Sequence, residues 1–412
     1  MPRLRGFALG KNEGGRLELV ATTGRSANAW SQGVWYANQT APGVWTGWQP
    51  LKAPPTDEKE TSMATLRRSR FPSRGIAVLA ALCLVSALAM AAPASATTPG
   101  KNGRIAFKGY LDADNSTGVI FTVRPDGTHA RQITFPAVGT VDDQPDWSPD
   151  GSLIAFRRCA PDTACAIYTV RPDGTHLRRL SPPCQATPPD LETECADESE
   201  VAFLPDGHRV VFTRATGRVR EFPNGEGFIE HSDIVIRDLS GRHTHVVLRG
   251  RPFAGDNAQM VASPDGTLIA FQRHNSPLAE PAGGIAVFVM RINGTHLRRI
   301  TPWSLRAGDH PDWSPDGRWI LFRSNEDGGF VNSQLYVVHP GGSGLRQITH
   351  VSADTMLLSA SFSPNGARIV FSQTGDSGQP DIFTMRVDGS DVHQVTRTPL
   401  WESAPDWGSR AD

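Results

Sequence analysis

The sequence carries almost no net charge, because 41 lysines and arginines are balanced by 42 aspartates and glutamates, for a formal net charge of −1. No overall field therefore draws the protein to nucleic acid or to an anionic membrane, and neither is an expected partner. After residue 96 the sequence also lacks an amphipathic helical pattern between its apolar segments. That absence excludes a parallel sheet covered by helices.

Glycine and proline, by contrast, are plentiful, with 40 and 32 residues in a chain of 412. Both residue types favour turns. The hydrophobic fraction of 39% still suffices for a core. The composition therefore predicts a folded protein with many turns.

A candidate signal peptide occupies 63–96. Several arginines precede an uncharged apolar run at 75–92, and Ala-Ser-Ala follows at 94–96. This order is typical of a secretory signal peptide. It predicts an exported protein, periplasmic or extracellular, with no stable membrane span once the signal is cleaved. The alternative, a retained membrane anchor, needs about 20 apolar residues and an uncleaved site.

The segment 1–62 precedes that signal. Because a signal peptide stands at the start of a chain, 1–62 are not expected in the mature protein, whether translation starts at Met1 or at Met63. Within 15–51, "GRLELVATTG" and "QTAPGVWTGW" resemble one blade of the tectonin-like or Photorhabdus-lectin-like β-propellers. A single blade cannot bury its own faces. The segment is therefore interpreted as a lectin-like relic or a misannotated start.

From residue 97 onward one turn motif recurs, with "WSPDG" as its fullest form. Proline presets the second position of a type I turn and glycine fits the last, so the aspartate between them is interpreted as structural. Each turn is followed by a continuous apolar strand, such as "LIAF" or "WILF", which means that both faces are covered. Sheets stacked between two neighbours are the blades of a propeller. The turns occupy 147–151, 203–207, 262–266, 313–317 and 362–366.

The first repeat of the mature chain lacks its first strand, and the end of the chain carries a surplus one. The segment "NGRIAF" at 102–107 begins abruptly, whereas "SAPDWG" at 403–408 has the form of the missing strand. The sequence therefore predicts an all-β fold, a six-bladed β-propeller of four-stranded blades over 97–412. The carboxyl-terminal strand closes it by pairing into the first blade, which leaves no open edge. Full repeats begin near Asp143, Glu200, Gln259, Asp309 and Ser359.

These repeats resemble those of the TolB-like family of WD40-like (PD40) propellers, whose blades carry "PDWSPDG…IAF…IY…DGT…LT". The resemblance covers about 97–408 and implies a six-bladed propeller of the cell envelope. The α/β domain that precedes the propeller in TolB is lacking, and no hydrolase domain follows as in related peptidases. We therefore expect a non-enzymatic protein without a cofactor, which binds a protein or cell-envelope component.

Loop length differs between the two rims of such a propeller. The loops that enter the inner strand and those after the second strand share one rim, and here they are the long ones. Binding residues usually lie on loops held by a rigid scaffold. This rim, the long-loop face, is therefore the predicted binding surface of an expected monomer. Its loops span 108–118, 135–143, 157–165, 181–199, 213–231, 249–257, 272–284, 302–309, 323–333, 372–380 and 397–403.

A ring of residues is predicted at the mouth of the central channel, one per blade and three positions before each Trp or Phe position. Such a ring could bind a polar ligand or a cation, or its polar members could simply line water. The resemblance adds a second hypothesis, carbohydrate binding or processing, because some propellers of this family act on sugars through His-lined, metal-containing channels. Here only His310 stands at the expected level, and no metal ligand set is predicted. The ring comprises Gln144, Glu200, Gln259, His310, Ser359 and Ala404, with Asp143, Asp309 and Glu402 beside it.

Four cysteines remain after the signal peptide, two in each of two neighbouring long loops. Export permits disulfides. Of the three possible pairings, the local ones are favoured, Cys159 with Cys165 and Cys184 with Cys195. A zinc site of all four thiolates is the alternative, although neither pair has the short CxxC spacing.

Three further motifs are not interpreted as functional. The segment "GDSGQP", which contains Ser377, resembles the nucleophile segment of a protease, but the sequence has no matching histidine segment. The calcium-like loop at 112–118 lacks the distal glutamate of an EF-hand. The "THLRR" stretches at 175–179 and 295–299 are interpreted as a solvated outer edge.

Overall fold

The computed structural model describes residues 99–161, 163–183, 196–222, 225–250, 257–275, 284–324, 332–352, 354–375 and 377–410, together with strands within 4–50. The predicted signal peptide, Cys184 and Cys195 lie outside the described residues. Among the stretches named above, no helix is long and apolar enough to cross a membrane.

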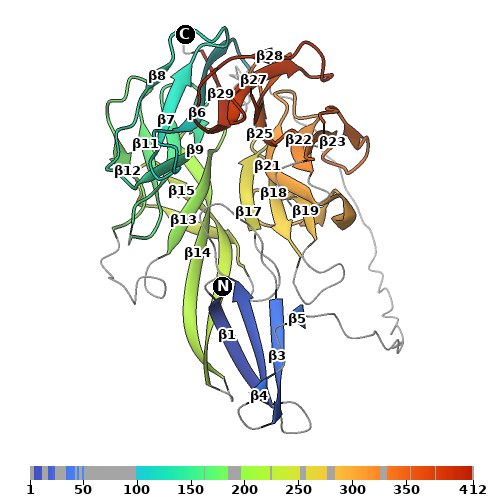
Figure 1. Cartoon of the computed structure of the whole chain (residues 1–412). Coiled ribbons are helices and arrows are strands. Elements are labelled where there is room, and N and C mark those ends of the chain that lie inside the picture. The colour runs from blue at the N-terminus through green and yellow to red at the C-terminus, as the bar shows by residue number, and fades with distance from the viewer. Residues whose placement is uncertain are drawn as a thin grey trace, which may run out of the picture.

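The described chain is all-β, as predicted, and its single helical segment is the 3-10 turn η1 (Trp303–Leu305) (Figure 1). The amino-terminal strands form one five-stranded sheet. Its resemblance to a lectin-like blade stays a prediction. The strands are β1 (Leu4–Lys11), β2 (Leu17–Thr23), β3 (Val34–Ala41), β4 (Val44–Trp45) and β5 (Gln49–Pro50).

Four antiparallel sheets of four strands each follow the repeats of the sequence, and in each the strands pair in chain order. The first comprises β13 (Asp197–Phe203), β14 (Arg209–Phe222), β15 (Gly225–Asp238) and β16 (Thr244–Leu248). The second comprises β17 (Asn257–Ala262), β18 (Leu268–His274), β19 (Ile285–Arg291) and β20 (Arg298–Arg299). The third comprises β21 (Ala307–Trp313), β22 (Ile320–Ser324), β23 (Gln334–Val338) and β24 (Arg346–Gln347). The fourth comprises β25 (Leu357–Phe362), β26 (Arg368–Thr374), β27 (Pro380–Arg386) and β28 (His393–Gln394).

The remaining strands form one eight-stranded sheet, in the order β12-β11-β10-β9-β7-β6-β29 with β8 paired to β7. The carboxyl-terminal strand β29 pairs antiparallel with β6, with Trp407 opposite Ile105, so the predicted pairing of 403–408 with the first repeat is observed. A single parallel pair, Gly118 with Val141, joins the two halves of this sheet. The strands are β6 (Asn102–Tyr110), β7 (Gly118–Val123), β8 (Arg131–Gln132), β9 (Val141–Trp147), β10 (Ile154–Cys159), β11 (Ala166–Val170), β12 (Arg178–Arg179) and β29 (Glu402–Ser409).

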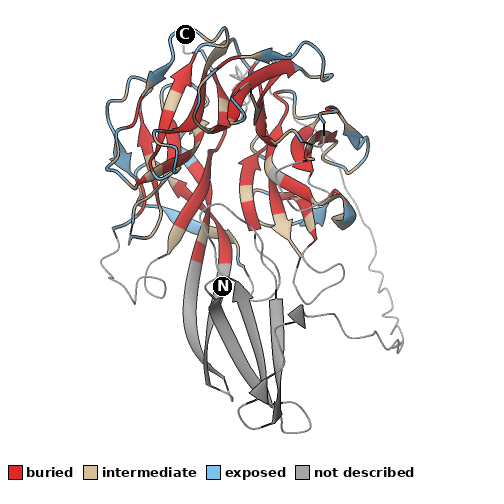
Figure 2. Ribbon diagram, viewed as in Figure 1, coloured by how far each residue is buried: buried red, intermediate tan, exposed pale blue. Residues whose placement is uncertain are grey.

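The core lies between the sheets, because their strands are buried on both faces, as the continuous apolar runs predicted (Figure 2). One apolar cluster contains Val211 of β14 and Phe271 of β18. Another contains Ile105 of β6, Val370 of β26 and Trp407 of β29. The beginning and the end of the repeat region therefore share a core.

The repeated turn has the structural role expected of it. The Ser148 hydroxyl donates to Asp150 Oδ1 over 2.7 Å, and the Leu153 N–H donates to Ser148 Oγ over 2.9 Å. Burial alone would raise the pKa of Asp150, but hydrogen bonds from Ser148 and Ser152 hold it below its ordinary value. The aspartate therefore fixes the turn and is not available for catalysis.

Candidate functional site

The predicted ring residues come together around one cavity of about 80 Å³, at which β9, β13, β17, β21, β25 and β29 meet. This cavity is called the central cavity below. Each of these strands has an irregularity in its pairing beside the ring residue, as in a β-bulge, which changes the direction of a side chain. Ring residues other than Ser359 have φ between 51° and 59°, a left-handed conformation that is uncommon without glycine. The lining includes Gln144, Glu200, Gln259, His310, Ser359 and Ala404.

Two ring residues hold neighbouring strands together. Glu200 Oε2 accepts hydrogen bonds from the Thr213 hydroxyl and from the Gln259 N–H, both over 2.9 Å. Gln259 Oε1 in turn accepts the His310 N–H over 2.5 Å. The bonds from the Gln259 and His310 N–H groups each join a ring side chain to the backbone of the next sheet's inner strand, so these groups have a structural function.

Gln144 differs from them. Its Nε2 lies 3.4 Å from His310 Nε2, on a strand 166 residues away in the chain. Its Oε1 is buried and has no hydrogen-bond partner. A buried acceptor without a donor is costly, so Gln144 differs from Glu200 and Gln259, whose side-chain oxygens accept hydrogen bonds.

A second layer of the cavity was missed by the sequence analysis. It contains Asp146, Asp312 and Asp406, the aspartates of the three "PDW" copies. Each carboxylate accepts a backbone N–H from a neighbouring strand of the cavity, that of Phe203, Phe362 and Trp147 respectively, over 2.6 to 2.8 Å. The repeated "PDW" itself was the signal that could have identified them.

Burial changes the ionisation of this layer. Burial, followed by repulsion from Asp406, raises the pKa of Asp146 well above its ordinary value. Burial likewise raises the pKa of Asp406. Among the side chains that the structure describes, no group of three His, Cys, Asp or Glu residues is placed to hold a metal ion.

The acids predicted beside the ring have different surroundings. Asp143 pairs with Arg157 Nη2 at 2.8 Å and with Lys108 Nζ at 3.3 Å. Burial alone would raise the pKa of Asp143, but these two cations lower it below its ordinary value. The Asp309 side chain lies outside the described part of the structure.

Glu402 is buried and accepts hydrogen bonds from the hydroxyls of Thr396 and Thr398. Burial raises its pKa to about 7, and the charge of Asp381 adds to the effect. Glu402 of β29 lies opposite Gly109 of the paired strand β6. Asp142 has the equivalent position on β9, but it lies opposite Arg158 of β10 and forms an ion pair with it. Glu402 is therefore a buried carboxyl that titrates near neutral pH.

The predicted disulfide between Cys159 and Cys165 is formed. In the calcium-like loop, the Asp112 carboxylate accepts the Ser116 and Thr117 N–H groups over 2.7 and 2.9 Å, so its oxygens close the loop itself. Ser377 is exposed, and its hydroxyl accepts the Gln379 N–H over 3.3 Å. Neither motif gains a functional partner from these contacts.

The arginines of the "THLRR" stretches are exposed on the outer strands β12 and β20, as interpreted, and two of them also contact the neighbouring sheet. Arg178 Nη2 donates to Ser240 O over 3.0 Å, and Arg298 Nη2 donates to Pro340 O over 2.7 Å. These arginines donate hydrogen bonds to the turn before the outer strand of the next sheet, because the outer strand of one sheet lies beside that turn.

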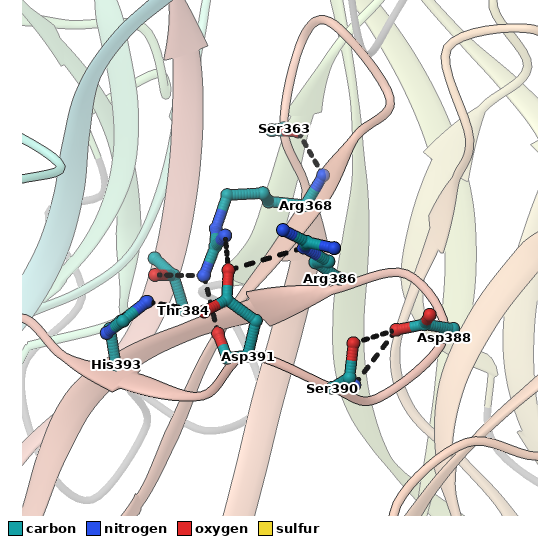
Figure 3. Close-up of polar contacts among 8 residues, drawn as sticks. All are labelled: Ser363, Arg368, Thr384, Arg386, Asp388, Ser390, Asp391 and His393. Carbon is teal, nitrogen blue, oxygen red and sulfur yellow. Dashed lines mark hydrogen bonds and ion pairs between the residues drawn. The ribbon is translucent and has the colours of Figure 1, made fainter.

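In the β25–β28 sheet, a cluster of polar and charged side chains lies around the turn between β27 and β28 (Figure 3). The Asp391 carboxylate pairs with Arg368 Nη1 at 2.6 Å, Arg386 Nε at 3.3 Å and His393 Nε2 at 2.8 Å. Asp391 has a φ of 56°, a left-handed conformation that disfavours most side chains and recurs at the equivalent His129, His176 and His296.

The family comparison agrees with this geometry. Residues 228–411 match the family model of the TolB beta propeller domain (PD40). This part of the chain is therefore similar to the TolB-like propeller family. A solved TolB structure is similar to nearly the whole chain, whereas no curated protein sequence matches it.

Two TolB structures illustrate the similarity. TolB from Acinetobacter baumannii has a TM-score of 0.55 and 17% identity, and the match covers 94% of this chain and 81% of that one. A putative TolB from Agrobacterium tumefaciens has a TM-score of 0.48 and 19% identity, covering 71% and 88%. At 17% identity, the Acinetobacter match shows a shared fold and not a shared activity.

The prediction that the chain is not an enzyme was wrong, because it excluded catalysis and enzymes occur among the similar structures. Oligogalacturonate lyase in complex with manganese has a TM-score of 0.43 and 15% identity, covering 73% of this chain and 86% of that one. A Mycobacterium tuberculosis puromycin-hydrolyzing peptidase and prolyl endopeptidases also match. The TolB-like fold alone therefore excludes no activity.

Proposed function

We propose that residues 97–412 form an exported, six-bladed TolB-like propeller that binds a protein or cell-envelope component through its long-loop face. The observation that carries the proposal is the difference between its two rims. In the described turns of the opposite rim, a glycine N–H donates to the carbonyl three residues earlier, as Gly151 does to Ser148 and Gly389 to Arg386. Such tight turns offer little surface, whereas the long loops do.

Six blades follow if the eight-stranded sheet counts as two, β29-β6-β7-β8 and β9-β10-β11-β12, joined by a single pair of residues. Contacts between first and last repeats support a closed ring. A Cβ on Gly127 would lie 2.5 Å from Val395 O, and Gly174 is similarly placed against Ile133 O at 3.0 Å. The same contact thus recurs between successive blades and between the last blade and the first.

Export is supported by the order of residues at 63–96 and by the Cys159–Cys165 disulfide. Disulfides form and persist in oxidising compartments and are rare in the cytosol. A periplasmic or other extracytoplasmic location is therefore part of the proposal.

The proposal predicts where a partner can be crosslinked in the native envelope. A photo-reactive phenylalanine analogue at Ala113 or Ser377, both exposed on the long-loop face, is expected to trap a partner. The same group at Ser152 or Arg318, both exposed on the opposite rim, serves as the matched control and is expected to trap none. Equal trapping from both rims, or trapping from the opposite rim alone, would contradict the proposed face.

A second candidate, recognition of a carbohydrate in the central cavity, is favoured by one observation, the unpartnered Gln144 Oε1. A sugar hydroxyl would donate to it. Saturable binding on a glycan array is then expected to weaken about tenfold in Gln144→Met, the scale of one lost hydrogen bond, and to persist in Gln379→Met, on a loop outside the cavity. Silence of the wild-type protein across the array would eliminate this candidate.

A further inference from the structure

Three exposed apolar side chains mark one part of the long-loop face. Val138 is 89% exposed, Phe135 is 76% exposed and Leu111 is 46% exposed. They lie on the loops 111–117 and 135–140, which join β6 to β7 and β8 to β9. These loops and the neighbouring disulfide loop, 159–165, are called the apolar platform below. Exposed apolar surface of this kind usually marks an interaction site.

Hydrogen bonds hold the two apolar loops together. The Gly139 N–H donates to Thr117 Oγ1 over 3.1 Å, and the Gly118 N–H donates to Thr140 O over 3.1 Å. Within the first loop, the Leu111 N–H donates to Thr117 O over 2.9 Å. Each loop is therefore fixed against the other, and Phe135 and Val138 remain exposed on a defined backbone.

The disulfide loop forms the third side of the apolar platform. Gly139 packs against Pro161, because a Cβ on that glycine would lie 3.3 Å from Pro161 Cγ. Pro161 lies within the loop that the Cys159–Cys165 bond closes. A surface organised in advance loses less entropy when it binds a partner.

The charges of the apolar platform have one sign. Asp112 and Asp114 lie on its first loop, and the described residues of its three loops include no lysine or arginine. The nearest cations along the chain, Lys108, Arg157 and Arg158, pair with the buried aspartates Asp142 and Asp143. The platform is therefore apolar and acidic, which disfavours an anionic lipid surface and favours a basic partner.

We propose that the apolar platform docks a protein segment in which an apolar side chain lies between lysines or arginines. This inference rests on the proposed function and specifies the chemistry of its partner. The apolar side chain of the partner covers Phe135 and Val138, and its cations lie beside Asp112 and Asp114. The apolar contact supplies most of the affinity, whereas the charges select the partner and speed its association.

The test uses the purified full chain and two synthetic peptides, GRKWLKRG and its acidic counterpart GEDWLDEG, each with a fluorescent label. The basic peptide is expected to bind at least about tenfold more tightly than the acidic one, and less tightly as the salt concentration rises. Phe135→Ser/Val138→Ser is expected to weaken its binding about tenfold or more. Leu177→Ser/Leu297→Ser, at exposed positions beside the outer strands β12 and β20, is the matched control and is expected to change nothing.

The charge is tested separately with Asp114→Lys. Asp114 is exposed, and its replacement leaves the hydrogen bonds of Asp112 within the loop in place. This variant is expected to lose the preference for the basic peptide. Equal affinity for the two peptides, an unaffected Phe135→Ser/Val138→Ser protein, or tighter binding to phosphatidylserine vesicles than to the basic peptide would overturn the inference.

Crosslinking from Ser377 in the Phe135→Ser/Val138→Ser background separates this inference from the proposed function. A partner still trapped there, together with unchanged peptide binding, would leave the long-loop face in use and overturn only the apolar platform. No trapping from any long-loop position in the wild-type protein would overturn both.

Discussion

Deleting residues 400–412 is expected to lower the free energy of unfolding by at least about 4 kcal/mol, the scale of a buried tryptophan lost from a core. The deletion removes β29, whose Trp407 is 3% exposed and packs with Ile105 and Val370. It also removes the Asp406 carboxylate that accepts the Trp147 N–H over 2.8 Å. The edge of β6 would then be unpaired. Urea unfolding of the intact and truncated proteins measures the loss.

Two variants control this deletion. Removing only 411–412 leaves β29 whole and is expected to leave the unfolding midpoint unchanged. Trp407→Ala keeps the strand and removes the indole, for an expected loss of about 3–5 kcal/mol, so it remains informative if the deleted protein fails to fold. Equal midpoints for the intact protein and the 400–412 deletion would show that the terminal strand does not stabilise the fold.

Raising the pH through neutrality is expected to destabilise the protein through Glu402. Burial raises the pKa of this carboxyl from its ordinary 4.5 to about 7, and Asp381 adds repulsion. Between these two values the folded state binds the proton and the unfolded state releases it, so the free energy of unfolding falls as pH rises. A shift of this size corresponds to about 3 kcal/mol, fully lost above the folded pKa.

Glu402→Gln is expected to remove this loss, because its amide stays neutral at every pH. The measurement is the difference in unfolding free energy between the wild-type protein and the variant at a series of pH values across neutrality. Asp146 and Asp406, whose pKa values burial also raises, act in the same direction in both proteins and cancel in the difference. A difference that does not change with pH would contradict the raised pKa.

Glu198→Gln is the matched comparison, because Glu198 stands two residues before a ring residue, as Glu402 does. Its carboxylate pairs with both terminal nitrogens of the buried Arg237, over 2.5 and 2.6 Å. Removing that charge leaves Arg237 without its counter-ion, for an expected loss of about 3–5 kcal/mol. The two glutamates thus give opposite results at alkaline pH, because one has a cation as its partner and the other does not.

The sequence predicted those features that arise within a repeat or between its identical copies. The turn at 147–151, the strand that completes the first repeat and the Cys159–Cys165 disulfide were all predicted. Each depends on residues that are close in the chain or on a motif that is visibly incomplete. The ring residues around the central cavity were also predicted, since equal positions in equal repeats face the same place.

What those ring residues do could not be predicted. The sequence indicated an open polar channel mouth, but the carboxylate of Glu200 and the amide of Gln259 are occupied by the backbone of the next sheet. Those contacts join residues 59 and 51 positions apart, and they depend on left-handed bulges that no sequence pattern indicated. The exclusion of catalysis failed for a related reason, since a fold shared by enzymes and non-enzymes does not determine activity.

The sequence by itself determined the all-β class, the TolB-like repeats and the terminal strand that pairs into the first repeat, because turn chemistry and apolar runs act locally. Only the tertiary structure decided which polar groups have a hydrogen-bond or ion-pair partner. It left Gln144 Oε1 without a partner, placed Glu402 opposite a glycine instead of an arginine, and left Phe135 and Val138 exposed on tied loops. Hydrogen-bond partners, burial and charge pairing depend on which segments meet in space, and so they are properties of the packed sheets.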